Sequence, residues 1–201
     1  MKRTLIIMVK EPRPGRVKTR LGRDIGVIPA TWWFRHQSAR LIRSLRDPRW
    51  QIVLAVAPDL AVRSKVWPAD LPRWPQGRGD LGQRMKRMLQ FMPCPRALRS
   101  SASKNPVCLI GADIPGITRT HIARAFAALG NHDAVFGPAA DGGYWLVGAK
   151  HPSRLPKDMF KGVRWSGEYA LADTLNTLPG WRTALTDTLQ DVDTAAELPR
   201  R

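Results

Sequence analysis

The chain has 201 residues, 43% hydrophobic and 24% charged, as expected for one soluble globular domain with a full-sized core. Its 33 basic residues outnumber 16 acidic ones, and the formal net charge of +17 favours anionic ligands. The basic residues are scattered rather than gathered in a tail, and no apolar run reaches the length of a membrane span, so neither a membrane protein nor a specific nucleic-acid-binding protein is expected.

The first predicted element is a strand, and a stiff basic loop follows it. The apolar run 5–9 predicts a buried strand. Residues 10–21 carry Lys or Arg at five positions, while Pro12 and Pro14 fix φ and Gly15 permits a tight turn. Ligands of open α/β sheets bind beyond the carboxyl ends of strands, so this loop is predicted to bind phosphates. The alternative is an exposed basic turn.

The loop does not match the known glycine-rich phosphate motifs. Lys18 stands three residues after Gly15, the first glycine of a Walker loop is missing, and there is no G-x-G-x-x-G. Phosphate binding must therefore depend on Lys and Arg side chains. Lys18 and Arg20 are the strongest candidates, whereas Arg13 and Arg16 are interpreted as surface charge.

Helices and strands alternate through the middle of the chain. Apolar residues at helical spacing between Phe34 and Leu45 predict a helix that starts near Pro29, with Trp32 and Trp33 in its first turn. Residues 51–57 predict a second strand, and 93–105 an exposed loop. Asp80 and Gln83 have the spacing of a capping box at the start of a helix. Its apolar face is interpreted as core and consists of Leu81, Met85, Met88, Leu89 and Met92.

The second half continues the alternation. Residues 107–110 predict a buried strand, Thr118 is expected to cap a helix, and further strands begin at 134 and 144. Ser166 is expected to cap a last helix that runs toward Leu178. This β-α-β order predicts an α/β fold whose mostly parallel sheet is covered by helices on both faces.

Three groups of acidic residues are candidates for chemistry. Asp113 directly follows the strand 107–110, where a carboxylate can present Mg²⁺ or Mn²⁺ to phosphate oxygens; a turn or cap is the alternative. Asp141 precedes two glycines and could grip hydroxyls or act as a general base; a hairpin turn is the alternative. If the segment 191–193 is extended, the side chains of Asp191 and Asp193 point the same way, which suits a second metal ligand. The alternative is a polar cap on a terminal turn.

The order of these motifs resembles one family. The basic loop is followed by Gln-Gly-Arg-Gly-Asp-Leu-Gly at 76–82, Gly-Ala-Asp-Ile-Pro at 111–115, Gly-Pro-Ala-Ala-Asp-Gly-Gly-Tyr at 137–144 and Asp-Val-Asp-Thr at 191–194. From about residue 4 to 198 the chain resembles the bacterial DUF2064 proteins, described as GT-A-type glycosyltransferases and linked by name to arsenosugar biosynthesis. That family is similar in fold to molybdenum-cofactor and phospholactate guanylyltransferases. The resemblance implies a single-domain nucleotide-diphospho-sugar transferase fold, GT-A and Rossmann-like, over residues 1–201.

The resemblance also implies roles for particular residues. The phosphates of a nucleotide would be held by Lys10, Gly15, Lys18 and Arg20, and its base and ribose would lie near Gln76, Gly77, Gly79 and Asp80. The metal would be held by Asp113 and by Asp193 or Asp191, and the acceptor side would consist of Asp141, Gly142, Gly143, Tyr144, Trp165 and Ser166. The chain departs from the family pattern at Arg78, Ala140 and Ala196, where a glycine and two acids are usual.

The resulting hypothesis is a metal-assisted transfer from a nucleotide sugar to a small acceptor. Lys18, Arg20 and a divalent cation at Asp113 would stabilise charge on the leaving phosphate, and Asp141 would position or deprotonate the acceptor hydroxyl. The alternatives are nucleotidyl transfer with release of pyrophosphate, a basic nucleic-acid-binding protein, and a decayed member that binds nucleotide without turnover.

Two features favour a cytoplasmic location. Cys94 and Cys108 are too few for a disulfide framework and lack metal-ligand spacing. Lys2, Arg3 and Lys10 flank an apolar run that is too short for a signal peptide.

Overall fold

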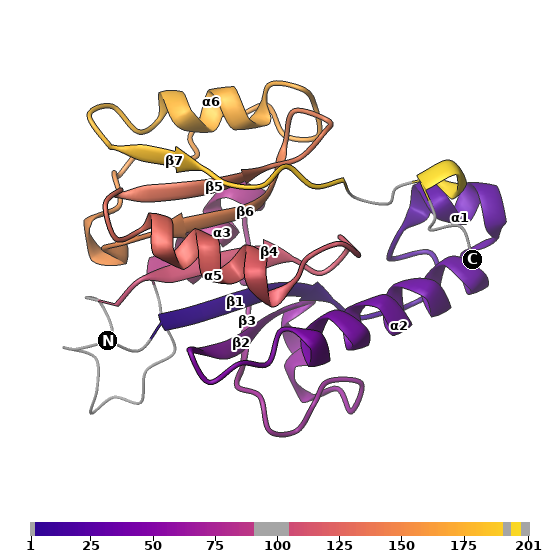
Figure 1. Cartoon of the computed structure of the whole chain (residues 1–201). Helices are drawn as coiled ribbons and strands as arrows, with labels where there is room; N and C mark the ends of the chain where they lie inside the picture. The colour runs from indigo at the N-terminus through magenta and orange to yellow at the C-terminus, as the bar shows by residue number, and fades with distance from the viewer. Residues whose placement is uncertain (1–2, 91–104, 191–193, 198–201) are drawn as a thin grey trace.

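A seven-stranded sheet forms the centre of the protein (Figure 1). The computed structural model describes residues 3–90, 105–190 and 194–197. The strands are β1 (Arg3–Lys10), β2 (Trp50–Ala57), β3 (Arg73–Pro75), β4 (Val107–Gly111), β5 (Ala134–Pro138), β6 (Tyr144–Ala149) and β7 (Thr183–Leu185). They are ordered β3-β2-β1-β4-β6-β5-β7, and only β6 runs antiparallel to its neighbours in this described sheet. The predicted mostly parallel sheet is confirmed.

Helices cover both faces of the sheet, as predicted. They are α1 (Thr19–Ile25), α2 (Val27–Ser44), α3 (Leu81–Gln90), α5 (Arg119–Ala128) and α6 (Ala170–Asn176), with the short 3₁₀ helices η1 (Asp59–Arg63), η3 (Pro152–Arg154) and η4 (Ala195–Glu197). Apolar residues of α2 and α5 belong to one core cluster, and those of α3 and α6 pack in the other.

Alternation along β1 explains why both faces need cover. Leu5, Ile7 and Val9 pack in the cluster of α2 and α5, while Ile6 packs in the cluster of α3. Successive side chains of a strand point to opposite faces, so a central strand covered on both sides is apolar at nearly every position. This is why β1 is a continuous apolar run.

The helix starts that the sequence signals most clearly are confirmed. The backbone N–H of Gln83 donates to the Asp80 carboxylate at 2.7 Å, and that of Asp80 donates to the Gln83 side chain at 3.2 Å. Thr118 and His121 form an equivalent capping box at the start of α5. Each capping box satisfies backbone donors that the first helical turn leaves without partners.

Other element boundaries were predicted wrongly or missed. The basic loop ends at Lys18, because Thr19–Ile25 forms the unpredicted helix α1, and Arg20 is therefore helical. Helix α2 begins at Val27, so Trp32 lies in its second turn. Ser166 does not cap a helix: its φ is +65°, and α6 begins at Ala170 after Tyr169.

Strands β3 and β7 were also missed, because runs of three residues carry too little periodicity to be recognised. Met92 and most of the predicted loop 93–105 lie outside the described residues.

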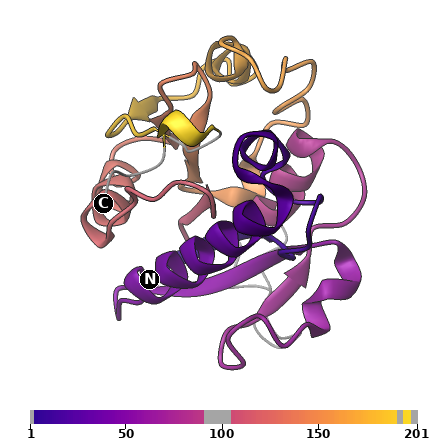
Figure 2. The same cartoon turned by 90° about the vertical axis from the view of Figure 1, so that its right-hand side faces the viewer.

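The C-terminal part of the described chain reaches α1. The backbone N–H of Ala195 in η4 donates to the carboxylate of Asp24 in α1 at 3.0 Å, and Figure 2 shows η4 beside that helix. Among the described helices, none has the length and apolar character needed to cross a membrane.

Candidate functional site

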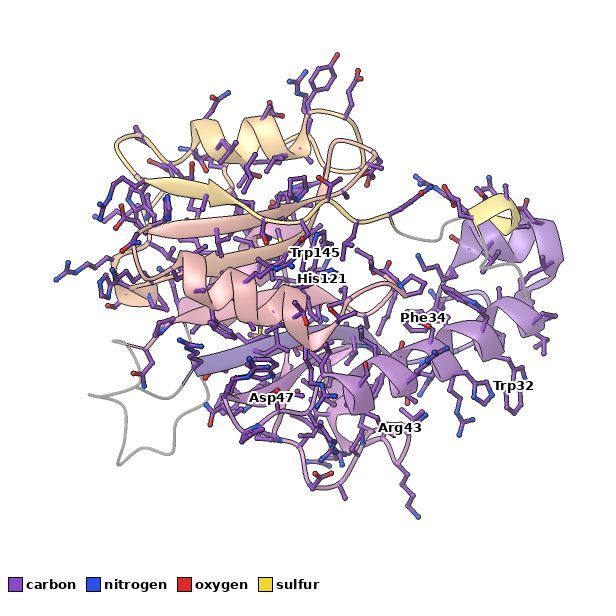
Figure 3. The ribbon with its side chains drawn as sticks, viewed as in Figure 1. Trp32, Phe34, Arg43, Asp47, His121 and Trp145 are labelled. Atoms are coloured by element: carbon purple, nitrogen blue, oxygen red, sulfur yellow. The ribbon has the colours of Figure 1, made fainter. Side chains whose placement is uncertain are left out.

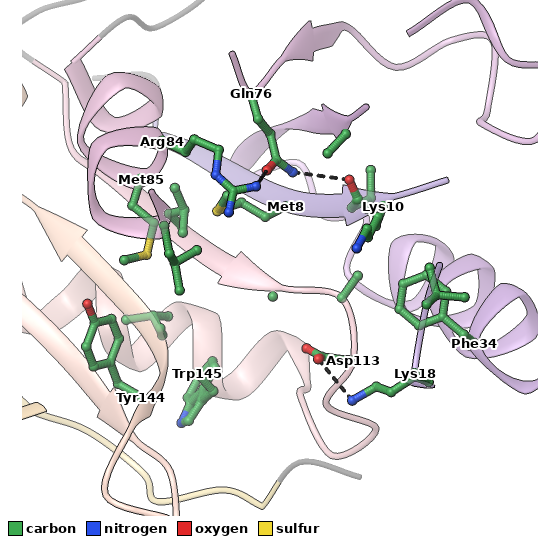
Figure 4. Close-up of a pocket in the computed structure, with 18 of the residues that line it drawn as sticks. Met8, Lys10, Lys18, Phe34, Gln76, Arg84, Met85, Asp113, Tyr144 and Trp145 are labelled. Carbon is green, nitrogen blue, oxygen red and sulfur yellow. Dashed lines mark hydrogen bonds and ion pairs between the residues drawn. The ribbon is translucent and has the colours of Figure 1, made fainter. Parts of the chain in front are cut away.

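A cavity of about 550 Å³ opens at the carboxyl edge of the sheet (Figure 4). The last residues of β1, those of β4 with the turn after it, and the first residues of the antiparallel β6 line it. In the sheet, β2 lies on one side of β1 and β4 lies on the other, so the direction in which successive strands are placed reverses between β1 and β4. Such a reversal is where open α/β sheets bind ligands, and the volume suits a small-molecule site.

The lining is strongly cationic. It includes the basic side chains Lys10, Arg16, Lys18, Arg20 and Arg84. Asp113, in the turn after β4, is the one acidic residue among the described residues that line this cavity. Because α1 follows the loop directly, the helix carries Arg20 to the same cavity as Lys10 at the end of β1. The site is therefore suited to an anion.

Lys18 and Asp113 form an ion pair in the lining of the cavity (Figure 4). The Nζ of Lys18 lies 3.0 Å from Oδ2 of Asp113; the Lys18 side chain is 6% exposed and that of Asp113 is 41% exposed. Lys18 is the N-cap of α1 and has φ 43° and ψ 51°, a left-handed conformation that costs a residue with a side chain roughly 1–2 kcal/mol. Strain of this kind tends to occur at functional sites, and here it accompanies the aim of the ammonium into the cavity.

Gln76 is a structural anchor for the wall opposite Lys18. It is 4% exposed, and its side-chain amide donates to the carbonyls of Val9 at 3.2 Å and Ala55 at 2.9 Å. Its oxygen accepts a hydrogen bond from the Arg84 guanidinium at 3.2 Å, and Arg84 also donates to the Asp80 carbonyl. Gln76 thus links the ends of β1 and β2 and orients a guanidinium that lines the cavity.

Apolar and aromatic side chains complete the walls. Met8, Phe34, Met85, Tyr144 and Trp145 line the cavity beside the charged groups. The hydroxyl of Tyr144 lies 3.3 Å from that of Thr174, and burial raises the pKa of Tyr144, so its phenol stays neutral near pH 7. These surfaces are suited to the flat and apolar parts of a ligand whose anionic part meets the basic residues.

The structure brings some of the predicted site residues together and leaves others apart. Lys10, Lys18, Arg20, Gln76, Asp113 and Tyr144 all line the cavity. The lining does not include Gly15, Gly77, Gly79, Asp80, Asp141, Gly142, Gly143, Trp165 or Ser166.

Most of the residues outside the lining have a structural role. Gly77 and Gly79 have positive φ in the turn before α3, and Asp80 caps that helix. Gly15 has φ +70°, as the predicted tight turn requires. Trp165 packs against the ring of Tyr144, with centroids 6.4 Å apart.

The turn 141–143 lies at the start of β6. The Asp141 carboxylate accepts a hydrogen bond from the backbone N–H of Gly143 at 2.9 Å, and the Asp141 residue is exposed. Gly142 has φ +84° and packs against the backbone of Glu168, where a Cβ would lie 2.3 Å from the carbonyl oxygen. The turn is thus held in a defined position, next to the cavity residue Tyr144.

Within the part of the chain that the structure describes, the carboxylate of Asp113 is the one available to a divalent cation in this cavity. Asp191 and Asp193 lie outside the described residues. Among the residues that are described, no group of three or more Asp, Glu, His or Cys side chains could hold a metal ion. The half-exposed Asp113 carboxylate fits Mg²⁺ or Mn²⁺ only as a partial ligand set, which is how Mg²⁺ commonly binds together with substrate phosphates and water.

Sequence reasoning did not assign several cavity residues to the site. Arg16 was interpreted as surface charge; it is exposed, as expected, and it also lines the cavity. Arg84 and Phe34 were not singled out, although both lie on predicted helices. The capping box at Asp80 sets the start of α3 and thereby the face on which Arg84 lies, but nothing in the sequence pairs that face with Gln76.

Comparisons with known proteins agree with this architecture. The model of a family described as uncharacterized proteins conserved in bacteria (DUF2064) matches residues 41–167. A crystal structure from Desulfovibrio desulfuricans G20, provisionally described as a nucleotide-diphospho-sugar transferase, matches with a TM-score of 0.80 and 29% identity over 96% of this chain and 84% of that one. No curated protein matches the chain in sequence.

More distant structures share the fold alone. Rv0371c from Mycobacterium tuberculosis H37Rv, solved in complex with manganese, has a TM-score of 0.55 at 12% identity over 98% of this chain and 95% of that one. The 4-diphosphocytidyl-2C-methyl-D-erythritol synthase from Anaerococcus prevotii DSM 20548 has a TM-score of 0.58 at 8% identity over 97% and 94%. The expected nucleotide-diphospho-sugar transferase-like fold is therefore confirmed.

Proposed function

The chain belongs to the DUF2064 family, and we propose that it transfers a glycosyl group from a nucleotide sugar to a small acceptor with the help of a divalent cation. The observation that carries the proposal is the cavity at the β1–β4 reversal, where, among the described residues, five basic side chains and the carboxylate of Asp113 line one space. The name of the D. desulfuricans relative supports the same class of reaction. We further propose that residues 1–201 act as one domain.

The donor would bind with its phosphates toward the basic loop. Lys10, Lys18 and Arg20 all line the cavity, and Gly15, with φ +70°, permits a tight turn in the loop between Lys10 and Lys18. Base and ribose would lie toward Gln76 and the turn formed by Gly77, Gly79 and Asp80, which Gln76 connects to the cavity. A mixed apolar and cationic lining suits a ligand that carries both a flat ring and a diphosphate.

Asp113 would hold the cation, with Asp193 or Asp191 as a second ligand. When bound, Mg²⁺ or Mn²⁺ would neutralise charge that develops on the leaving phosphate. The 3.0 Å pair of Lys18 and Asp113 is compatible with this arrangement, because a cation on the carboxylate and a phosphate on the ammonium would keep both charges compensated.

The chemistry assigned to the chain's own residues is electrostatic stabilisation and proton transfer. The bond between the sugar carbon and the phosphate oxygen breaks, and Lys18 and Arg20 stabilise the nucleoside diphosphate that leaves. Asp141 would position the acceptor hydroxyl and take its proton as the new bond to the sugar forms. Gly142, Gly143, Tyr144, Trp165 and Ser166 would shape the acceptor side around it.

Ligand-induced thermal stabilisation tests the donor site. Nucleotides and nucleotide sugars are screened with and without Mn²⁺, and we expect at least one to raise the Tm more when Mn²⁺ is present. Arg20→Ala should weaken the ligand about tenfold or more, as expected for the loss of a charged hydrogen bond. Arg23→Ala is the matched control, because Arg23 lies on the same helix but does not line the cavity. Equal effects of the two variants would contradict the proposed donor site.

Asp113→Asn tests the cation. We expect this variant to retain metal-free nucleotide binding and to lose the additional stabilisation by Mn²⁺. A full Mn²⁺ effect in Asp113→Asn would remove Asp113 from the metal site.

The leaving group separates the two transfer reactions. Glycosyl transfer releases a nucleoside diphosphate, whereas nucleotidyl transfer releases pyrophosphate, and both products are measured directly in turnover mixtures. We expect the diphosphate, and Asp141→Asn should lower its rate of release about 100-fold or more, the usual contribution of a general base. Pyrophosphate as the product would replace the proposed reaction by nucleotidyl transfer.

A further inference from the structure

A second cationic hollow lies on the opposite side of the basic loop. Two cavities of about 410 and 260 Å³ share Pro12, Arg35, Lys65 and Val66 among their lining residues, so they form one continuous groove between α2 and the segment 64–68. We call it the α2 groove. None of its described lining residues lines the main cavity.

The α2 groove carries uncompensated positive charge. Five basic side chains line it, of which Arg13 pairs with Glu11 at 2.6 Å and Arg46 pairs with Asp70. For the other three, Arg35, Arg43 and Lys65, no ion pair occurs within the described part of the chain. Figure 3 shows Arg43 and Trp32 on α2 away from Phe34, which lines the main cavity. The groove is therefore suited to an anion.

A buried hydroxyl in the groove lacks a partner. Ser38 lines the larger cavity, is 2% exposed, and its Oγ makes no hydrogen bond within the described structure. The other two hydroxyls of α2 behave differently, since Thr31 donates to the Val27 carbonyl at 2.7 Å and Ser44 to the Leu41 carbonyl at 3.0 Å. A buried hydroxyl left unpaired costs about 1–3 kcal/mol, so an unpaired one in a groove that three cations also line points to a ligand atom.

The floor of the groove is apolar. Ile42 is 1% exposed and Trp67 is 5% exposed, and both line the larger cavity together with Val66 and Pro68. The indole N–H of Trp67 is already engaged with the Ala61 carbonyl, so the ring offers only apolar surface. A fitting ligand therefore combines a compact anion with an apolar body.

We propose that the α2 groove binds a small phosphomonoester that carries an apolar group, with its phosphate between Arg35, Arg43 and Lys65 and within reach of the Ser38 hydroxyl. The apolar group lies on Ile42 and Trp67. Three cations outweigh the two negative charges of a phosphate dianion, and the Ser38 hydroxyl donates to one of its oxygens. The site does not depend on the function proposed for the main cavity.

The first test is a local one, because phosphate compounds would also enter the main cavity. Amine acylation of Lys65, read by mass spectrometry, is followed as phenyl phosphate is titrated, with Lys161 as a surface reference. We expect protection of Lys65 by phenyl phosphate at lower concentration than by inorganic phosphate, since only the former has an apolar group. Equal protection by chloride at matched ionic strength would indicate charge screening and overturn the proposal.

Variants on α2 assign the protection to the groove. Arg43→Ala should raise the phenyl phosphate concentration for half protection about tenfold or more. Arg40→Ala removes the same charge from the same helix at a position outside both cavities and should leave it unchanged. Equal shifts in the two variants would overturn the proposal.

Ser38→Ala should change protein stability and ligand affinity in opposite directions. It should raise the Tm of the ligand-free protein, because an unpaired buried hydroxyl disappears, and should weaken phenyl phosphate about tenfold. An unchanged half-protection concentration would show that Ser38 does not meet the ligand. The last experiment adds vesicles of phosphatidylcholine with phosphatidic acid. Protection of Lys65 by these vesicles, without protection by phenyl phosphate, would overturn the proposed small ligand in favour of a lipid surface.

Discussion

Gln76 provides the sharpest test of how the main cavity is built. Its amide joins the carbonyls of Val9 and Ala55 at the ends of β1 and β2, and its oxygen holds Arg84. Gln76→Met preserves most of the side-chain volume and removes all three hydrogen bonds. We expect this substitution to destabilise the protein and to release Arg84 from its position in the cavity wall.

The magnitude follows from the contacts. The two amide bonds are buried and each contributes about 1 kcal/mol net, while the bond to the half-exposed Arg84 contributes less than a fully buried charged bond, because water can replace it. Methionine also leaves two strand-end carbonyls without their donor. Together these effects lower the free energy of unfolding by about 3 kcal/mol, or roughly 6–12 °C in Tm for a chain of this length.

Urea unfolding, followed by tryptophan fluorescence, measures this change. Gln90→Met is the matched control, since Gln90 is exposed at the end of α3, and it should change stability by less than about 0.5 kcal/mol. Gln76→Glu separates the contacts further, because it keeps an acceptor for Arg84 and loses the donor to the two carbonyls. We expect it to be at least as unstable as Gln76→Met at pH 7.5. Wild-type stability of Gln76→Glu would refute the assigned role of the strand carbonyls.

Two further predictions concern the turn 141–143 and the ion pair of Arg164 with Asp173. Gly142→Ala should lower the free energy of unfolding by about 3 kcal/mol, because alanine would be strained at φ +84° and would overlap the backbone of Glu168. The control Gly162→Ala, at φ +73° in open space, should lower it by about 1 kcal/mol. Equal urea midpoints of the two variants would exclude the overlap. The Arg164 guanidinium holds the pKa of Asp173 at about 2, below its unfolded value. The stability that this pair adds is therefore present above about pH 4 and disappears as the pH falls toward 2. A difference in the free energy of unfolding between wild type and Asp173→Asn that stays constant from pH 6 to pH 2.5 would contradict this.

Local sequence signals predicted much of the fold and part of the site. The apolar runs of β1, β2 and β4, the capping box of α3 and the Thr118 cap of α5 are short-range patterns, and the structure confirms each of them. Asp113 could be expected at the edge of the sheet because it directly follows a buried strand. The loop of 10–18 could be expected there for the same reason.

The tertiary structure decided how these parts meet. Lys18 and Asp113 form an ion pair although they are 95 positions apart in the sequence, and Gln76 holds Arg84 at the cavity. Both contacts depend on the order of the strands and not on neighbouring residues. Arg16 is exposed, as the sequence indicates, but only the structure shows that it also lines the cavity. Periodicity and capping act over a few residues, so the sequence by itself determined the long elements and the capped starts of α3 and α5, but not the short elements α1, β3 and β7. Which side chains share a cavity depends on the order in which strands pair, and packing of the whole sheet sets that order.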